Sequence, residues 1–285
     1  MATVVSLINM KGGVGKTTLA MQLAMGAASK GMKVLGVDLD PQSNLSQATL
    51  GVHRYVEHLK ADKPTVIQIF EGYMPPTATT GGPTSVDPDK IIIKQVTGKH
   101  ETLDLLPSRL ELCRTLRNPT GKERKLAKFL VKIQQDYDLI LIDCAPTDSI
   151  LTDAAYFASR YILVPVKPEF MAAIGLPLLA KSLLSFKSEN EDHQLEICGI
   201  VFNHSSSYST AGPEGRTTIK EVTAVAKDEK WPVFENEVRY SASYAKSARE
   251  GTSIRGTSHS RWSAIQNFEA VRDEFFKSVA LTPPK

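Results

Sequence analysis

The chain has 285 residues, 42% of them hydrophobic, which fits a globular protein of one large or two smaller domains. It has no run of about 18 apolar residues, so we expect no membrane span. The net charge of +3 neither requires nor excludes an acidic partner. Cys113, Cys144 and Cys198 form no C-x-x-C pair, which disfavours disulfides and zinc and favours a reducing cytoplasm. The first apolar run begins almost at Met1, so no signal peptide is expected.

The N-terminal part predicts a strand, a glycine-rich loop and a helix. Residues 3–9 are mostly β-branched or apolar, which indicates a buried strand. The loop Lys11–Thr18 follows, with the sequence K-G-G-V-G-K-T-T. Apolar residues then recur at helical spacing from Leu19 to Ala27, and Gly31 is expected to end that helix. This order of elements is the context that a phosphate-binding loop requires.

The loop departs from the ordinary phosphate-loop pattern G-x-x-x-x-G-K-[ST]. The first glycine is missing and a second lysine, Lys11, precedes the others, which gives the deviant Walker A box K-G-G-x-G-K-[ST]. The glycines let backbone N–H groups turn inward around the β- and γ-phosphates, and the start of the helix adds its positive end. We expect Lys16 to reach these phosphates and the Thr17 hydroxyl to bind Mg²⁺. Lys11 lies outside the minimal loop, where it can reach phosphates bound by a second subunit.

Carboxylates end two of the later predicted strands. The strand at 33–40 ends in Asp38 and Asp40, and the strand at 137–143 ends in Asp143. A single Asp in such a place is more often a turn or cap residue, but a phosphate loop in the same sheet reverses that expectation. Asp143 then has the Walker B role of holding Mg²⁺ directly or through water, and Asp40 can orient or deprotonate the attacking water. Asp38 fits either the Mg²⁺ shell or a structural role.

These motifs together predict an ATPase with ATP and Mg²⁺ as its cofactors. The predicted catalytic residues are Lys11, Lys16 and Asp40, and the predicted metal-binding residues are Thr17, Asp38 and Asp143. The predicted nucleotide-binding residues are Lys11, Gly12, Gly13, Val14, Gly15, Lys16, Thr17 and Thr18, with Asn203 from the end of a later strand.

Strand and helix patterns alternate along the rest of the chain. Further strands are expected at 103–106, 161–166 and 197–203, and helices at 122–135 and 176–188. This alternation predicts one α/β domain over residues 1–285: a doubly wound, mainly parallel sheet with helices on both faces. The nucleotide is expected at the carboxyl ends of the strands. Residues 74–88 are rich in Pro, Gly and Thr and predict a flexible surface loop, not a domain boundary.

Basic residues gather in the last quarter of the chain. Arg216 precedes a helix-like segment, and the stretch from Arg239 to Arg261 holds five basic residues against one acid, Glu250. Such residues can neutralise DNA phosphates without reading bases. Taken alone, the pattern is more typical of a solvated charged face.

The chain resembles the ParA family of partition ATPases, within the ParA/MinD group of deviant Walker A proteins. The residues that carry the resemblance are Lys11–Thr18, residues 37–44 (V-D-L-D-P-Q-S-N), 103–108, 137–146, 164–169, and Val238-Arg239 followed by Gly251. The resemblance spans most of the chain, and the Asp-Pro-Gln after the second strand is more similar to ParA than to MinD. Because the phosphate loop lies near Met1, we expect no N-terminal helix-turn-helix and no operator-specific binding.

The resemblance implies an ATP-bound sandwich homodimer in which Lys11 contacts the partner's ATP and Asp40 activates water. It also implies non-specific DNA binding, with Arg216 and Arg239 at positions where family members carry DNA-contacting arginines. Clustering adds three further candidates: Lys246, Arg249 and Arg255. A ParB-like adaptor would stimulate slow hydrolysis, and the cycle would position a plasmid, a chromosome or a protein assembly over the nucleoid. The implied localisation is cytoplasmic and nucleoid-associated.

Three other classes of protein were weighed. A MinD-like membrane-associated positioning ATPase would need a basic amphipathic tail, but acidic residues dominate the polar face of this one, so we expect core packing and no membrane partner. The apolar face of the tail consists of Phe268, Val271, Phe275 and Val279, and its acids are Glu269, Asp273 and Glu274. An iron–sulfur carrier would need paired cysteines. A small-molecule kinase or synthetase would need a substrate pocket that the sequence does not reveal.

Overall fold

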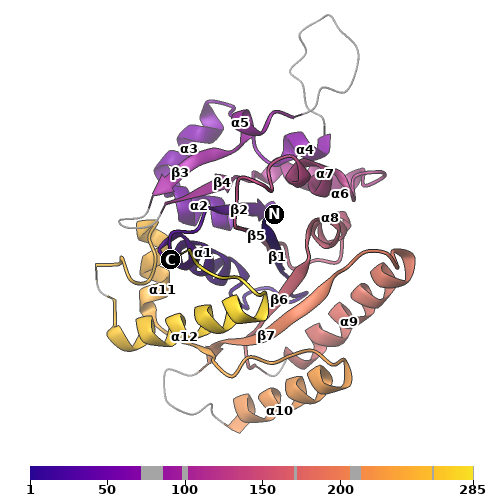
Figure 1. Ribbon diagram of the computed structural model, residues 1–285, viewed down its shortest axis with the longest axis vertical. Helices are drawn as coiled ribbons and strands as arrows, with labels where there is room; N and C mark the ends of the chain where they lie inside the picture. Colours follow the sequence, from indigo (N-terminus) through magenta and orange to yellow (C-terminus); the bar gives the residue numbers. More distant parts are fainter. Residues whose placement is uncertain (72–85, 98–101, 170–171, 206–212, 259, 285) are drawn as a thin grey trace, which may run out of the picture.

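The computed structural model describes residues 1–71, 86–97, 102–169, 172–205, 213–258 and 260–284. These residues form an eight-stranded sheet with the order β3-β4-β2-β5-β1-β6-β7-β8, covered by helices (Figure 1). All neighbouring strands are parallel except β3 and β4. The strands are β1 (Thr3–Leu7), β2 (Val34–Leu39), β3 (Ile93–Thr97), β4 (Thr102–Leu106), β5 (Leu139–Cys144), β6 (Tyr161–Val166), β7 (Glu196–Ser205) and β8 (Val238–Arg239).

Helices cover both faces of the sheet, as the alternating pattern predicts. The helices are α1 (Lys16–Ala28), α2 (Asn44–Leu50), α3 (Val52–Lys60), α4 (Ile67–Glu71), α5 (Pro88–Ile91), α6 (Cys113–Arg117), α7 (Lys125–Val131), α8 (Ile150–Ala158), α9 (Ala172–Glu189), α10 (Pro213–Asp228), α11 (Ala242–Glu250) and α12 (Trp262–Ser278), with a 3₁₀ turn at Leu110–Leu112. One core packs α1, α2, α11 and α12 on one face, and the other packs α4, α7, α8 and α9 on the opposite face. The doubly wound fold is therefore confirmed.

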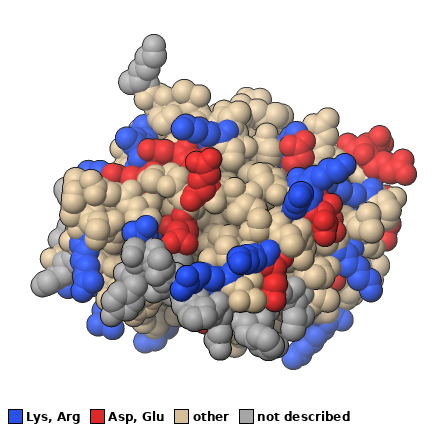
Figure 2. Space-filling view, turned by 90° about the horizontal axis from the view of Figure 1, so that it is seen from below, with Lys and Arg blue, Asp and Glu red and all other residues tan. Residues whose placement is uncertain are grey.

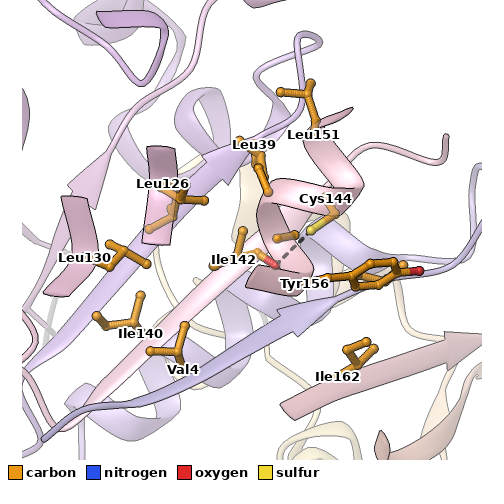
Figure 3. Close-up of a cluster of buried hydrophobic side chains, with 14 of the residues drawn as sticks. Val4, Leu39, Leu126, Leu130, Ile140, Ile142, Cys144, Leu151, Tyr156 and Ile162 are labelled. Atoms are coloured by element: carbon orange, nitrogen blue, oxygen red, sulfur yellow. Dashed lines mark hydrogen bonds between the residues drawn. The ribbon is translucent and has the colours of Figure 1, made fainter. Parts of the chain in front are cut away.

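The central strand β5 shows why the parallel strands are nearly all apolar. Leu139 and Leu141 belong to the core beneath α1, whereas Ile140 and Ile142 belong to the core beneath α7 and α8. Figure 3 shows the second of these cores. Since both faces of each central strand are buried, successive side chains must be apolar on both sides.

The structure departs from the sequence predictions at the bounds of some helices. The helix predicted at 122–135 is shorter, because α7 ends at Val131 and tightens into turns in which Lys132 N and Ile133 N bond to carbonyls three residues earlier. Arg216 lies within α10, not ahead of it. The predicted loop at 74–88 lies outside the described residues except for 86–88.

The C-terminal helix α12 packs into the protein core. Its apolar residues Phe268, Val271 and Phe275, and Val279 directly after it, are at most 4% exposed, so the predicted core packing of the tail is confirmed. Within the described part of the chain, no helix is long and apolar enough to cross a membrane.

Three adjacent strands bring the predicted site together. In the order β2-β5-β1, Asp143 on β5 is in register with Asp38 on β2 and with Leu7 at the end of β1. The carboxyl ends of these strands therefore lie at one edge of the sheet, where the loop after β1 begins.

Candidate active site

The loop between β1 and α1 has the backbone that its glycines predict. Gly13 and Gly15 have φ angles of +75° and +86°, a conformation that side chains with a Cβ rarely adopt. Gly15 is also required by a neighbour, because a Cβ there would lie 2.0 Å from Nδ2 of Asn203. By contrast, a Cβ at Gly13 would have no atom within 4 Å. Gly15 is therefore restricted by both its conformation and its surroundings.

Asn203 of β7 contacts the backbone of the loop between β1 and α1. Its Nδ2 donates a hydrogen bond of 2.7 Å to the carbonyl of Val14, and its side chain is buried. The sequence assigned Asn203 to the nucleotide site without a mechanism, and the structure places it against the loop backbone. A buried amide in this position fixes the turn that the phosphates would occupy.

The start of the loop is held by Asn9, which the sequence analysis did not assign to the site. Its Nδ2 donates to the Pro165 carbonyl at 2.8 Å, and its Oδ1 accepts from Lys11 N at 2.9 Å. A Cβ at Gly175 would lie 3.1 Å from the same Oδ1, so α9 approaches closely here. Asn9 thus ties the loop to β6 on one side and faces α9 on the other.

Lys16 is folded across the loop. Its Nζ donates to the carbonyls of Asn9 and Lys11 at 3.0 and 3.1 Å, and the side chain is buried. Burial lowers the pKa of Lys16, while the nearby groups Asp143 and Asp40 act in the opposite direction. Both of its acceptors are neutral carbonyls, so the ammonium can exchange them for phosphate oxygens, which bind a cation more strongly.

Lys11 points away from Lys16. Its Nζ lies 3.5 Å from Oε2 of Glu169, which also pairs with Lys167 in the loop after β6. The Lys11 side chain is 25% exposed. The two lysines of the motif therefore have separate environments, and only Lys16 is buried against the loop.

Asp38 is fully engaged in hydrogen bonds. Its Oδ2 accepts from the Ser46 amide at 2.8 Å and from the Ser46 hydroxyl at 2.6 Å, and its Oδ1 accepts from Asp40 N at 3.2 Å. Burial raises the pKa of Asp38 to about 7, although these hydrogen bonds oppose the shift. Of the two roles that the sequence left open, these contacts favour the structural one, in which Asp38 anchors α2.

Asp143, unlike Asp38, is not held by a set of short hydrogen bonds. It is 1% exposed, and within the described structure neither of its oxygens has a hydrogen-bond partner of normal geometry. Burial, followed by the charge of Asp38, raises the pKa of Asp143 well above its ordinary value, and the Thr17 hydroxyl and Lys16 offset part of this. A buried carboxylate that is only partly compensated by Thr17 and Lys16 is costly, so the site fits a cation.

Mg²⁺ is the cation that these residues suit. Among the described residues, no group of three His, Cys, Asp or Glu side chains could hold a metal. Mg²⁺ needs no such cage, because it keeps several waters and uses one or two protein oxygens together with substrate phosphates. Thr17 and Asp143 would hold it here.

Cys144 follows Asp143 in the chain, and Cys113, Cys144 and Cys198 are all free cysteines.

Asp40 follows β2 directly, at the carboxyl edge of the sheet. Its Oδ1 accepts from Gln42 N at 2.8 Å, and the residue is 7% exposed. Ser43 then adopts a left-handed backbone with φ of 56° before α2 begins. The turn therefore fixes one oxygen of Asp40, and the second can accept a proton or orient a water.

The five predicted DNA-binding residues do not form one uniformly basic surface. Arg239 lies 3.8 Å from Glu237, Lys246 lies 3.9 Å from Glu250, and Arg255 pairs with Glu269. Arg216 on α10 and Arg249 on α11 are exposed. Figure 2 shows Lys and Arg interspersed with Asp and Glu on the face seen from below.

Known proteins are similar to this chain in sequence. The AAA_31 family model, described as an AAA domain, matches residues 2–197. The chain is 31% identical over 234 residues to the sporulation initiation inhibitor protein Soj of Bacillus subtilis, which is 80% of this chain and 81% of that protein. It is also 31% identical over 221 residues to the chromosome-partitioning ATPase Soj of Treponema pallidum, or 78% of each chain.

A solved structure shows the same fold. A variant of Cyanothece McdA in complex with ATP superposes with a TM-score of 0.80 at 18% identity, covering 100% of this chain and 98% of that one. At that level of identity the likeness concerns the fold alone.

Proposed function

Because this chain belongs to the AAA_31 family, and within it to the ParA-type ATPases, we propose that it hydrolyses ATP with Mg²⁺ as a dimer on DNA. The ATP dimer would bind DNA without sequence preference, and an adaptor protein would stimulate hydrolysis. The cycle would position a plasmid, a chromosome or a protein assembly over the nucleoid. The observation that supports the site assignment best is the buried Asp143, which lacks hydrogen-bond partners of normal geometry and lies near Thr17 and Lys16.

The loop and its supports would bind the triphosphate. Backbone N–H groups of the loop and the N-terminus of α1 provide donors, and Asn203 and Asn9 hold that backbone in place. Lys16 would leave its two carbonyl acceptors for phosphate oxygens. Mg²⁺ bound at Thr17 and Asp143 would offset negative charge on the phosphates. Asp40 would accept a proton from the attacking water or orient it.

Lys11 would act between subunits. Its side chain leaves the loop and reaches Glu169, an exposed residue that a partner's phosphate could replace. An ammonium that meets phosphates at an interface where water is scarce neutralises charge more effectively than in water. A dimer also doubles the number of basic residues that meet DNA, so ATP could switch DNA binding on without a large movement in either subunit.

The membrane alternative has less support in the structure. The apolar side chains of α12 that could enter a lipid surface, such as Phe268 and Phe275, are buried against α1 and the sheet. We therefore propose DNA as the surface on which the ATPase works.

The test combines turnover with DNA retention. Purified protein with ATP and Mg²⁺ should retard duplexes of unrelated sequence, and the protein with ADP should not. Asp143→Asn removes the charge that fits Mg²⁺ and should lower turnover by about 100-fold or more. Equal DNA binding with ATP and ADP would overturn the proposed switch, and unchanged turnover of Asp143→Asn would overturn the metal assignment.

A further inference from the structure

A cleft of about 780 Å³ lies between α3 and the beginning of β3, away from the phosphate loop. Figure 1 shows α3, α5 and β3 together at one edge of the molecule. Helix α3 lines the cleft with Arg54, Glu57 and His58, residues at the spacing of a single helical face. Leu50 and Ile92, both buried, form its apolar floor.

The charged groups around the cleft are mostly positive. Arg54, Lys63 and Lys90 line it, against the single acid Glu57. Within the described residues neither Arg54 nor Lys63 has an ion-pair partner, and Lys90 reaches Asp87 only at 4.0 Å. Burial lowers the pKa of His58, which disfavours its charged form. The cleft therefore offers cations above an apolar floor.

The wall opposite α3 is the edge of the sheet. β3 is the outermost strand and pairs with β4 alone in the described sheet. Ile93 at its start and Ile92 directly before it line the cleft. An edge strand presents main-chain N–H and C=O groups to which an extended segment can add. β3 is bulged between Ile93 and Val96, and Gln95 N donates to Asp104, so backbone pairing would be confined to the beginning of this strand. The cleft adds apolar contacts and cations there.

We propose that this cleft binds an extended segment of a partner protein in which Asp or Glu side chains alternate with apolar ones. The acidic side chains would meet Arg54 and Lys63, and the apolar ones would cover Leu50 and Ile92. DNA fits less well, because its sugar–phosphate backbone would make no favourable contact with the apolar residues, and its phosphates would be repelled by Glu57. Leu50 ends α2, whose Ser46 holds Asp38, so the occupant contacts the helix that carries the Asp38 anchor.

The test is a selection of peptides on the intact protein. A displayed library of random 12-residue peptides is selected on the wild type and counter-selected on an Arg54→Glu, Lys63→Glu double variant. Enriched peptides should carry acids alternating with apolar residues, and their fluorescein-labelled forms should bind the double variant about tenfold more weakly or worse. The matched control is Lys128→Glu with Lys132→Glu, two exposed positions on and just after α7, where binding should be unchanged.

Two further measurements decide the interpretation. ATP turnover of the double variant without peptide should equal that of the wild type, since Arg54 and Lys63 lie outside the nucleotide site, and this shows that the variant is folded. The proposal is overturned if no selected peptide depends on Arg54 and Lys63. It is also overturned if the double variant loses duplex DNA affinity while peptide binding persists, which would assign this face to DNA. The peptide outcome does not depend on whether the proposed ATP cycle and DNA binding are correct, so failure of this proposal and failure of the proposed function can be told apart.

Discussion

Alanine at position 15 tests how strongly the phosphate loop depends on β7. The new Cβ would lie 2.0 Å from Nδ2 of Asn203, so Asn203 must move and lose its bond of 2.7 Å to the Val14 carbonyl. The backbone at Gly15 has a φ of +86°, which an L-residue adopts only at a cost. Gly15→Ala therefore combines a conformational cost with the loss of a buried hydrogen bond.

The two costs can be given rough sizes. A left-handed backbone costs about 1–2 kcal/mol for a residue with a Cβ. A buried polar group left without its partner costs about 1–3 kcal/mol. Together they amount to about 2–5 kcal/mol, which is about 30-fold to several thousand-fold in the population of the binding-competent loop. The affinity for a fluorescent ATP analogue should fall by this factor.

A double-mutant cycle separates the two costs. In the Asn203→Ala background the clash is absent, so Gly15→Ala should cost only the left-handed term of about 1–2 kcal/mol. Gly13→Ala is the matched control, because its φ is +75° but its Cβ would meet nothing within 4 Å. Its effect should be the same with and without Asn203. If Gly15→Ala costs equally in both backgrounds, the reasoning about Asn203 is refuted.

Three further predictions concern hydrolysis, dimerisation and DNA. Asp40→Ala should keep ATP binding but slow single-turnover hydrolysis by about 100-fold or more, because a group that orients or deprotonates water is lost; normal turnover would reject its role. Lys11→Ala should bind ATP as a monomer but fail to dimerise in light scattering with a non-hydrolysable analogue, and a normal dimer would contradict the intersubunit contact. Charge reversal at Arg216 and Arg239 should weaken binding to all duplexes equally and lower the slope of log K against log salt by about 1 per lost phosphate contact. Survival of DNA affinity in that variant would place the DNA surface elsewhere.

Local patterns account for the parts of the site that the sequence predicted. Lys16, Thr17 and Asp143 stand next to elements whose type and burial are visible in the sequence, so their placement at the carboxyl edge follows from the parallel sheet. The structure brings them together as expected. The sequence could not choose between two roles for Asp38, because the choice depends on Ser46, eight residues later, whose hydroxyl and amide both bond to it.

For the basic residues, clustering along the chain was a poor guide to the folded surface. Clustering along the chain suggested a common surface, but Arg255 pairs with Glu269, an acid outside the basic stretch, and Lys246 lies near Glu250. A count over a sequence window weighs charges by their distance along the chain, whereas a DNA phosphate senses the net field of the folded surface. Arg216, on another helix and without an ion pair among the described residues, is therefore the stronger candidate.

Gln22 shows why long-range polar contacts escape prediction. It lies in the middle of α1 and is 1% exposed, a degree of burial more typical of an apolar residue. Its Nε2 donates to Ser247 Oγ at 2.5 Å and its Oε1 accepts from Ile254 N at 2.7 Å, across more than 220 residues of sequence. Because α1 starts at the phosphate loop and Ser247 belongs to α11, one buried amide joins the helix of the nucleotide site to the helix of Arg249. Breaking that contact would leave buried polar groups unpaired, so the two helices are held in a fixed relation.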